Sequence, residues 1–207
     1  MRLRNVKGAK DIIDSSKMVI KDYLDYKGKF KEIFKNNNPI HLEIGTGKGN
    51  FIINMAKKYP NINFIGIEKY DSVLVRALEK IDYLDNLKFI RADAINVDEI
   101  FDKEIDIIYL NFSDPWPKER HRHRRLSDEY FLKRYDSLFA TKKHIIMKTD
   151  NRKLFEYSII QFTNYGYKID NISLNLYDDD IIDNIPTEYE NKFQSKGFPI
   201  YKIEIYK

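Results

Sequence analysis

Short apolar runs alternate with amphipathic segments along most of this 207-residue chain. Apolar runs bounded by turn residues predict buried strands, and apolar residues spaced three and four apart predict helices. The predicted strands are 40–44, 63–68, 87–91, 105–112, 144–148, 168–176 and 200–206. The predicted helices are 50–59, 72–84, 97–101, 128–139 and 152–162. This alternation predicts right-handed crossovers between parallel strands.

The pattern therefore predicts a Rossmann-like α/β fold, with a mostly parallel seven-stranded sheet and helices on both faces. We expect one domain over 1–207, with a polar N-terminal extension at 1–38 that ends in a run of asparagines and Pro39. In such sheets, ligands bind beyond the carboxyl ends of the strands, near the switch in strand order.

Composition excludes several classes of protein. The chain has no cysteine, so disulfides, thiolate metal sites, iron–sulfur clusters and cysteine nucleophiles are excluded. No run approaches the ~18 apolar residues of a membrane span, and no apolar stretch follows the basic N-terminus as in a signal peptide. We expect a cytoplasmic globular protein with no membrane partner.

A glycine-rich loop joins the first strand to the first helix, with the sequence Glu43-Ile44-Gly45-Thr46-Gly47-Lys48-Gly49. It is not a P-loop, because no serine or threonine follows Lys48, and Asn50 replaces the third glycine of the dinucleotide fingerprint. A carboxylate at Glu43 suits an ammonium or a sulfonium better than a pyrophosphate.

Two further acids follow the next two strands. Glu68 ends its strand, where an acid commonly binds a ribose hydroxyl pair. Asp93 follows the third strand, where it could accept a hydrogen bond from an exocyclic amine such as that of adenine. With Glu43, these acids predict a pocket for a cationic nucleoside, and S-adenosylmethionine fits that description better than a nicotinamide dinucleotide. A simple tight turn is the structural alternative for the glycine loop.

The loop after the fourth strand, Asn111-Phe112-Ser113-Asp114-Pro115-Trp116-Pro117-Lys118, has two prolines around the only tryptophan. Proline fixes φ, so this loop is stiff and suited to hold functional groups. Its functional interpretation places Asp114 beside the methyl donor, as the central catalytic residue. The structural alternative is a packed turn in which Trp116 fills a hydrophobic gap.

The loop continues into a basic segment, residues 118–125, which has five positive charges and one negative charge. Lysine outnumbers arginine elsewhere in the chain, yet four of these five cations are arginines. The planar guanidinium suits phosphate and base edges, so we expect nucleic-acid binding here. A solvated charged face is the alternative.

These motifs together resemble the bacterial tRNA (guanine-N7-)-methyltransferases. The most specific parts are Ser113-Asp114-Pro115-Trp116-Pro117-Lys118 and Thr187-Glu188-Tyr189-Glu190. Further similar segments, in the same order, are 1–4, 42–49, 66–68, 120–126, 148–158, 192–193 and 197–201. The resemblance therefore spans essentially the whole chain. One departure is His123, where the family usually has lysine.

The resemblance implies a Rossmann-like, S-adenosylmethionine-dependent enzyme that methylates N7 of a guanine in tRNA, expected at position 46 of the variable loop. It also implies roles for individual residues. The implied cofactor contacts are Glu43, Gly45, Gly47, Glu68, Asp93 and Asp114. The implied substrate contacts are Lys118, Arg120, His121, Arg124, Arg125, Asp150, Thr187, Glu188, Tyr189 and Glu190.

Guanine presents a hydrogen-bond donor edge, and the acids of the substrate set suit it. We expect Asp150, Glu188 and Glu190 to accept from the guanine N1–H and the N2 amine, which would select guanine over adenine. Two structural alternatives stay open: Asp150 as a helix cap, and Thr187 to Glu190 as a plain acidic surface loop within the segment 178–197. We expect that segment to be a mobile substrate loop.

Two other functions stay possible at this point. One is a methyltransferase for another RNA base or a small molecule, and the other is a non-catalytic RNA-binding module. No metal is expected, because His121 and His123 lack further ligands. No obligate protein partner is evident, and the chain is expected to be a monomer or a homodimer.

Overall fold

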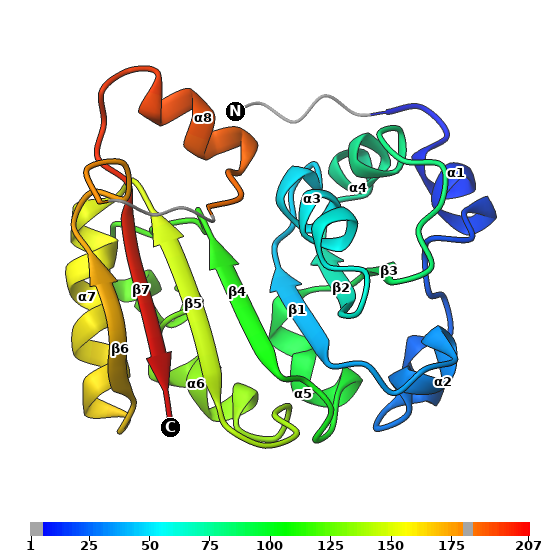
Figure 1. Cartoon of the computed structure of the whole chain (residues 1–207), viewed down its shortest axis with the longest axis horizontal. Helices are drawn as coiled ribbons and strands as arrows, with labels where there is room; N and C mark the ends of the chain where they lie inside the picture. The colour runs from blue at the N-terminus through cyan, green and yellow to red at the C-terminus, as the bar shows by residue number, and fades with distance from the viewer. Residues whose placement is uncertain (1–5, 180–183) are drawn as a thin grey trace.

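A seven-stranded sheet in the order β3-β2-β1-β4-β5-β7-β6 runs through the molecule (Figure 1). Its strands are β1 (Ile40–Ile44), β2 (Asn63–Glu68), β3 (Leu87–Arg91), β4 (Ile107–Asn111), β5 (His144–Thr149), β6 (Lys168–Ser173) and β7 (Tyr201–Tyr206). The first five pair in parallel, whereas β7 is antiparallel to both β5 and β6. This is a computed structural model that describes residues 6–179 and 184–207. The expected Rossmann-like, mostly parallel seven-stranded sheet is confirmed.

Helices cover both faces of the sheet (Figure 1). They are α1 (Ala9–Ser15), α2 (Phe30–Phe34), α3 (Asn50–Lys58), α4 (Asp71–Leu78), α5 (Val97–Ile100), α6 (Glu129–Tyr135), α7 (Arg152–Asn164) and α8 (Glu188–Gln194). Short 3₁₀ helices lie at Tyr23–Tyr26, Ala94–Asn96 and Glu119–Arg124.

Two hydrophobic cores lie on opposite faces of the sheet, because successive side chains of a strand point to opposite sides. On β2, Ile65 and Ile67 join the core that contains Phe30, Phe131 and residues of α7. Phe64 of the same strand joins the core formed with α1, α3 and α4. Strands buried on both faces read as continuous apolar runs, which is why their bounds follow closely from the sequence.

Three elements differ from those that the sequence predicts. The helix expected at 72–84 ends at Leu78, although Ile81 and Leu84 still pack on the core beyond its end. The strand expected at 168–176 ends at Ser173. The acidic segment 178–197, expected as a loop, contains α8, because Thr187 and Glu190 form a capping box that starts a helix.

The N-terminal extension contributes to the packing of the sheet. Its Val19 makes an isolated parallel bridge to Phe89 of β3, and α1 packs on α4. Residues 1–4, which are among the segments that resemble the methyltransferase family, lie outside the described residues. In the part of the chain that is described, no helix is long and apolar enough to cross a membrane.

Candidate active site

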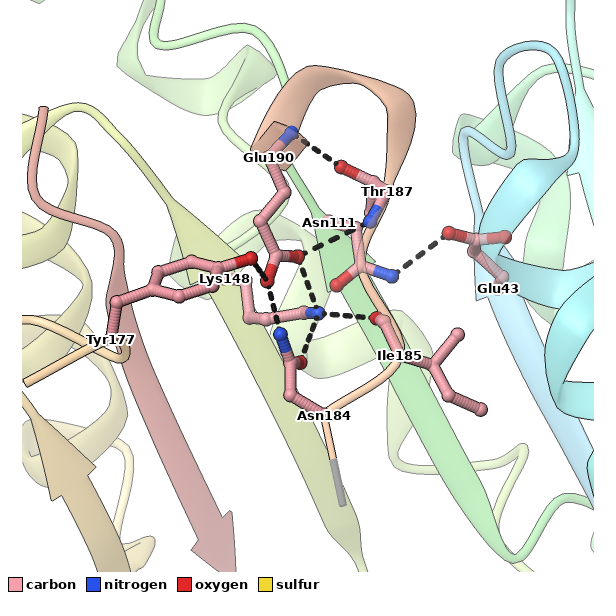
Figure 2. Close-up of polar contacts among 8 residues, drawn as sticks. All are labelled: Glu43, Asn111, Lys148, Tyr177, Asn184, Ile185, Thr187 and Glu190. Carbon is pink, nitrogen blue, oxygen red and sulfur yellow. Dashed lines mark hydrogen bonds and ion pairs between the residues drawn. The ribbon is translucent and has the colours of Figure 1, made fainter. Parts of the chain in front are cut away.

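The carboxyl ends of β1 and β4 meet at the switch in strand order, where α/β sheets bind ligands. Glu43 of β1 and Asn111 of β4 face each other there, and the Asn111 side-chain amide donates to Glu43 Oε1 at 2.9 Å (Figure 2). The other Glu43 oxygen is buried and has no hydrogen-bond partner. This pair lies at the base of the candidate site.

Burial gives Glu43 unusual electrostatics. Desolvation raises the pKa of its carboxyl group to about 8, although the Asn111 amide and nearby Lys148 oppose the shift. Thr46 Oγ1 and Asn111 Oδ1 are also buried without partners. Buried polar atoms are nearly always paired, so three orphaned oxygens in one place indicate room for a donor. An ammonium group, which only donates, fits that set.

A small pocket that is partly open to solvent lies above this pair. Its walls come from the glycine loop, the start of α3, the end of β4 and the start of α8. The lining residues are Glu43, Gly45, Thr46, Gly47, Lys48, Asn50, Phe51, Asn111, Phe112, Thr187, Glu188 and Tyr189. Six of the residues that the sequence predicts for the site therefore lie on one pocket.

Glu68 holds the glycine loop in shape. Its carboxylate accepts from the backbone N–H of Gly47 at 3.0 Å and from that of Tyr70 at 2.9 Å. Burial raises the pKa of Glu68 in spite of these two donors. Gly45 and Gly47 have φ of 79° and 57°, a region that favours glycine, and a Cβ at either would meet no atom within 4 Å. The loop thus offers bare backbone to a ligand.

The loop after β4 is strained on both sides of the candidate catalytic residue. Phe112 and Trp116 have φ of 50° and 40°, which is uncommon for residues other than glycine. Such strain concentrates at functional sites. Between them, the exposed Asp114 lies close enough to Glu68 for its charge to raise the pKa of Glu68 further. The loop therefore brings Asp114 to the same edge of the sheet.

Asp93 already has a partner. Its carboxylate pairs with Lys69 Nζ at 2.6 Å and accepts from the Ile95 backbone N–H at 3.3 Å, so it caps a 3₁₀ turn. Arg124 of the basic segment is close enough to oppose the pKa shift of Lys69. Asp93 therefore lies near the basic segment, and it does not line the pocket.

The basic segment has two kinds of arginine. Arg120, Arg122 and Arg124 are exposed, as is Lys118. Arg125 is only 7% exposed, and its guanidinium donates to the Trp116 carbonyl at 3.1 Å and lies over the Tyr157 ring at 4.2 Å. Arg125 therefore has a structural role, because it holds the Trp116 carbonyl and packs on Tyr157.

Trp116 is not the hydrophobic plug of the packed-turn alternative. It is half-buried, with Arg124 over its ring at 4.8 Å and the His121 ring edge-on at 5.9 Å. These contacts join the proline-rich loop to the basic segment. The two motifs therefore form one surface.

The N-terminus of α8 closes the far side of the pocket. Glu188 pairs with Lys48 of the glycine loop at 3.1 Å, and the ring of Tyr189 is near-parallel to that of Phe112, with centroids 6.5 Å apart. Glu190, by contrast, is fully buried and pairs with Lys148 at 2.7 Å (Figure 2). Of the two glutamates expected at the base edge, Glu188 is the exposed one.

Asp150 directly follows β5 and is half-buried, and burial raises its pKa. The helix-cap alternative for Asp150 is wrong, because Asn151 caps α7 by accepting from the Leu154 N–H at 2.9 Å. The Asp150 side chain makes no hydrogen bond to another described residue. Asp150 is therefore free for a ligand, although it does not line the pocket.

Sequence reasoning missed Asn111 and Lys148. Asn111 is next to the last residue of the most apolar predicted strand, 105–112, and a polar residue near a strand end is a signal that could have identified it. Lys148 ends the predicted strand 144–148 and carries the same signal, but the local sequence does not indicate that its amine is buried. Among the residues described, no three histidine, aspartate or glutamate side chains form a group able to hold a metal ion.

Comparison with known proteins agrees with this arrangement. A family described as "Putative methyltransferase" matches residues 37–203. The chain is 49% identical to the tRNA (guanine-N(7)-)-methyltransferase of Lachnoclostridium phytofermentans, over 98% of this chain and 97% of that one. It is 46% identical to the enzyme of the same name from Bacillus subtilis strain 168, over 99% and 98%.

Solved structures share the fold at low sequence identity. One titled as an antibiotic-related methyltransferase superposes with a TM-score of 0.64 at 17% identity, over 86% of this chain and 93% of that one. A 16S rRNA (adenine(1408)-N(1))-methyltransferase from Catenulisporales acidiphilia, solved with its cosubstrate S-adenosylmethionine, gives 0.60 at 11% identity, over 86% and 89%. With near-50% identity over almost the full length to the curated enzymes, the chain belongs to the tRNA (guanine-N(7)-)-methyltransferase family.

Proposed function

We propose that this enzyme transfers the methyl group of S-adenosylmethionine to N7 of a guanine in tRNA, at position 46 of the variable loop. The observation that carries the proposal is the half-paired, buried Glu43 at the β1–β4 switch point, which suits a cationic ligand. The family to which the chain belongs indicates the methyl acceptor, because the relatives are named for the guanine N7 of tRNA.

The chain offers matched groups for each part of the methyl donor. Glu43 and Asn111, with Thr46, suit an ammonium group. Glu68 suits a ribose hydroxyl pair, once its bond to the Gly47 N–H is exchanged or shared. Asp93 suits an exocyclic amine once it exchanges its ion pair with Lys69, although it does not line the pocket. When bound, the donor supplies a methyl group on a positively charged sulfur.

The acceptor atom explains what the protein has to do. Guanine N7 has a lone pair and no proton, so transfer to it needs no general base. The residues instead have to position the base and compensate the positive charge that develops on the purine ring. Asp114, exposed on its strained loop beside Glu68, is suited to both tasks. Glu188 and Asp150 are suited to accept from N1–H and the N2 amine.

The tRNA backbone would follow the basic segment. Lys118, Arg120 and Arg124 are exposed and cationic, and His121 packs on Trp116 beside them. Side chains cannot read the narrow major groove of A-form RNA, so the target guanine has to be accessible in a loop or turned out of its stack. A cytoplasmic location and a monomer or homodimer remain predictions.

The proposal is tested with methyl-labelled donor and unmodified tRNA transcripts that carry guanine or adenine at position 46, followed by nucleoside analysis. We expect 7-methylguanosine in the guanine transcript only. Asp114→Ala is expected to lower turnover about 100-fold in a folded protein, whereas Asp170→Ala, an exposed carboxylate of β6, serves as the unchanged control. Equal labelling of both transcripts would contradict the assigned position, and near-normal turnover of Asp114→Ala would contradict its role.

A further inference from the structure

Lys148 is a buried cation whose described hydrogen bonds all go from its amine to one stretch of chain, and the amine also lies over the Phe51 ring, 5.1 Å from its centroid. It lies on β5 and is 4% exposed, and its Nζ donates to Asn184 Oδ1 at 3.1 Å, to the Ile185 carbonyl at 3.0 Å and to Glu190 Oε2 at 2.7 Å (Figure 2). An ammonium group has three protons to donate, so all of them are used. Each goes to the segment 184–190, which carries the start of α8.

The Glu190 carboxylate likewise uses all of its hydrogen-bond acceptor positions. Its Oε2 accepts from Lys148 and from the Thr187 backbone N–H at 3.2 Å, and its Oε1 accepts from the Tyr177 hydroxyl at 3.1 Å and from the Asn184 amide. A carboxylate offers about four acceptor positions. All four are filled and the side chain is fully buried, so none is left for a guanine edge.

The segment needs such an anchor. α8 has only seven residues, too few for a helix to be stable without tertiary contacts. The capping box pairs the backbone N–H groups of Thr187 and Glu190, and the bond to Lys148 joins this first turn to the sheet. Lys148 is also near enough to Glu43 to lower the pKa of Glu43. One buried cation therefore binds segment 184–190, hereafter the substrate segment, and also acts on the charge of Glu43 in the pocket.

Glu188, in contrast to the buried Glu190, has only exposed or partly exposed ion-pair partners among the described residues. Its side chain is 46% exposed, and it pairs with Lys48 at 3.1 Å and with Lys80 at 4.0 Å, both partly exposed. Exposed ion pairs contribute little to stability, so this carboxylate can exchange partners readily. It also lines the pocket, next to Tyr189.

We infer that Lys148 is a positioning residue that fixes the substrate segment to the sheet through Glu190, and that Glu188 is the glutamate of this segment that reads the guanine. The inference rests on the proposed function and refines it. Glu190, expected from the sequence to contact the base, acts on the substrate only through the placement of α8.

The anchor is tested first without any substrate. Glu190→Gln leaves a buried cation unpaired, Lys148→Met leaves a buried carboxylate unpaired, and the double variant leaves neither. Glutamine keeps the capping box. We expect each single variant to melt about 10 °C below wild type, with faster amide exchange across residues 187–194, and the double variant to recover most of both losses. A double variant no better than Glu190→Gln overturns the anchor.

Base reading is tested with tRNA that carries inosine, which lacks the N2 amine, in place of the target guanine. We expect wild type to favour guanine about 10–100-fold in kcat/KM, since a good bidentate contact has that effect. Glu188→Ala should lose most of this preference. Glu190→Gln and Lys148→Met should lower kcat/KM for both substrates and keep the ratio, and the double variant should restore activity toward wild type.

The outcomes separate the claims. Loss of the guanine preference in Glu190→Gln, with no recovery in the double variant, means that Glu190 contacts the base and overturns the inference. A preference that is absent in wild type, or intact in Glu188→Ala, overturns the role of Glu188. No methylation of any guanine transcript by wild type contradicts the proposed function, while the melting and exchange measurements still decide the anchor.

Discussion

Adjacent arginines in the basic segment have opposite environments. Arg124 is exposed and stacks on Trp116, so its charge is available to a phosphate. Arg125 is buried, bonded to the Trp116 carbonyl and packed on Tyr157. The first is suited to bind RNA, and the second holds the proline-rich loop against α7.

We expect the two arginines to respond differently to truncation. Arg124→Ala should weaken tRNA binding and reduce the salt dependence of log Kd by about one unit, without lowering the melting temperature. Arg125→Ala should lower the free energy of unfolding by about 1–3 kcal/mol, because the Trp116 carbonyl loses its buried donor. Binding titrations at several salt concentrations and thermal melts measure both, with Lys168→Ala of β6 as control. An unchanged salt dependence in Arg124→Ala would exclude that phosphate contact.

The contrast between exposed and buried charged residues shows which properties of single residues could be predicted from the sequence. Glu43 and Glu68 were identifiable because strand ends follow from apolar runs, and functional side chains gather there. Burial of individual side chains did not follow, because it depends on which distant segment covers them. Lys148, Glu190 and Arg125 are charged residues whose burial the local sequence does not indicate.

At the scale of elements, the glycine loop depends on a close approach by β2. A Cβ on Gly66 would lie 2.5 Å from Thr46 Cγ2 and 3.1 Å from Phe89 Cδ1. Gly66 has no positive φ, so the need for glycine is steric. Its absence of a side chain lets Thr46 pack down and leaves the loop open above it.

Gly66→Ala is therefore expected to displace the loop, with a loss of about 1–3 kcal/mol in the free energy of unfolding and weaker cofactor binding. Thr46→Ser in the same chain removes the colliding methyl group and should recover part of both losses. Denaturant melts and calorimetric titration measure them. Full stability in Gly66→Ala, or no recovery in the double variant, would show that this contact does not shape the loop.

Element bounds were predicted best where strands are buried on both faces. The helix α8 was missed, because residues 178–190 contain six acids and few apolar residues. The capping-box pattern of Thr187 and Glu190 was present in the sequence, and it marks a helix start even in a polar segment. Residues 180–183, part of the expected mobile loop, lie outside the described residues.

At the scale of the whole molecule, the strand order creates the site. Crossovers from β1 lead to β2 and β3 on one side, and β4 and β5 lie on the other. The loops that follow β1 and β4 therefore lead to opposite sides of the switch in strand order. Helix α8 lies beyond the ends of β4 and β5 (Figure 1). Residues of the first half that are expected to bind the cofactor and residues of the second half that are expected to bind the substrate therefore line one pocket.

We propose that Glu43, the buried carboxyl group of this pocket, receives the positively charged methyl donor. With a pKa of about 8, Glu43 is mostly protonated near neutral pH in the free enzyme. A bound cation favours the ionised form, so binding has to release a proton, and affinity has to rise as pH increases toward that pKa.

The most direct measurement is calorimetric titration of S-adenosylmethionine at about pH 6 and about pH 7, in buffers of different ionisation enthalpy, with wild type and Glu43→Gln. We expect binding by wild type to tighten by up to about tenfold over this interval, with proton release. Glu43→Gln should bind weakly, with the pH dependence lost. Equal affinity at both pH values without proton release, or an unchanged pH dependence in Glu43→Gln, would contradict this account of the site.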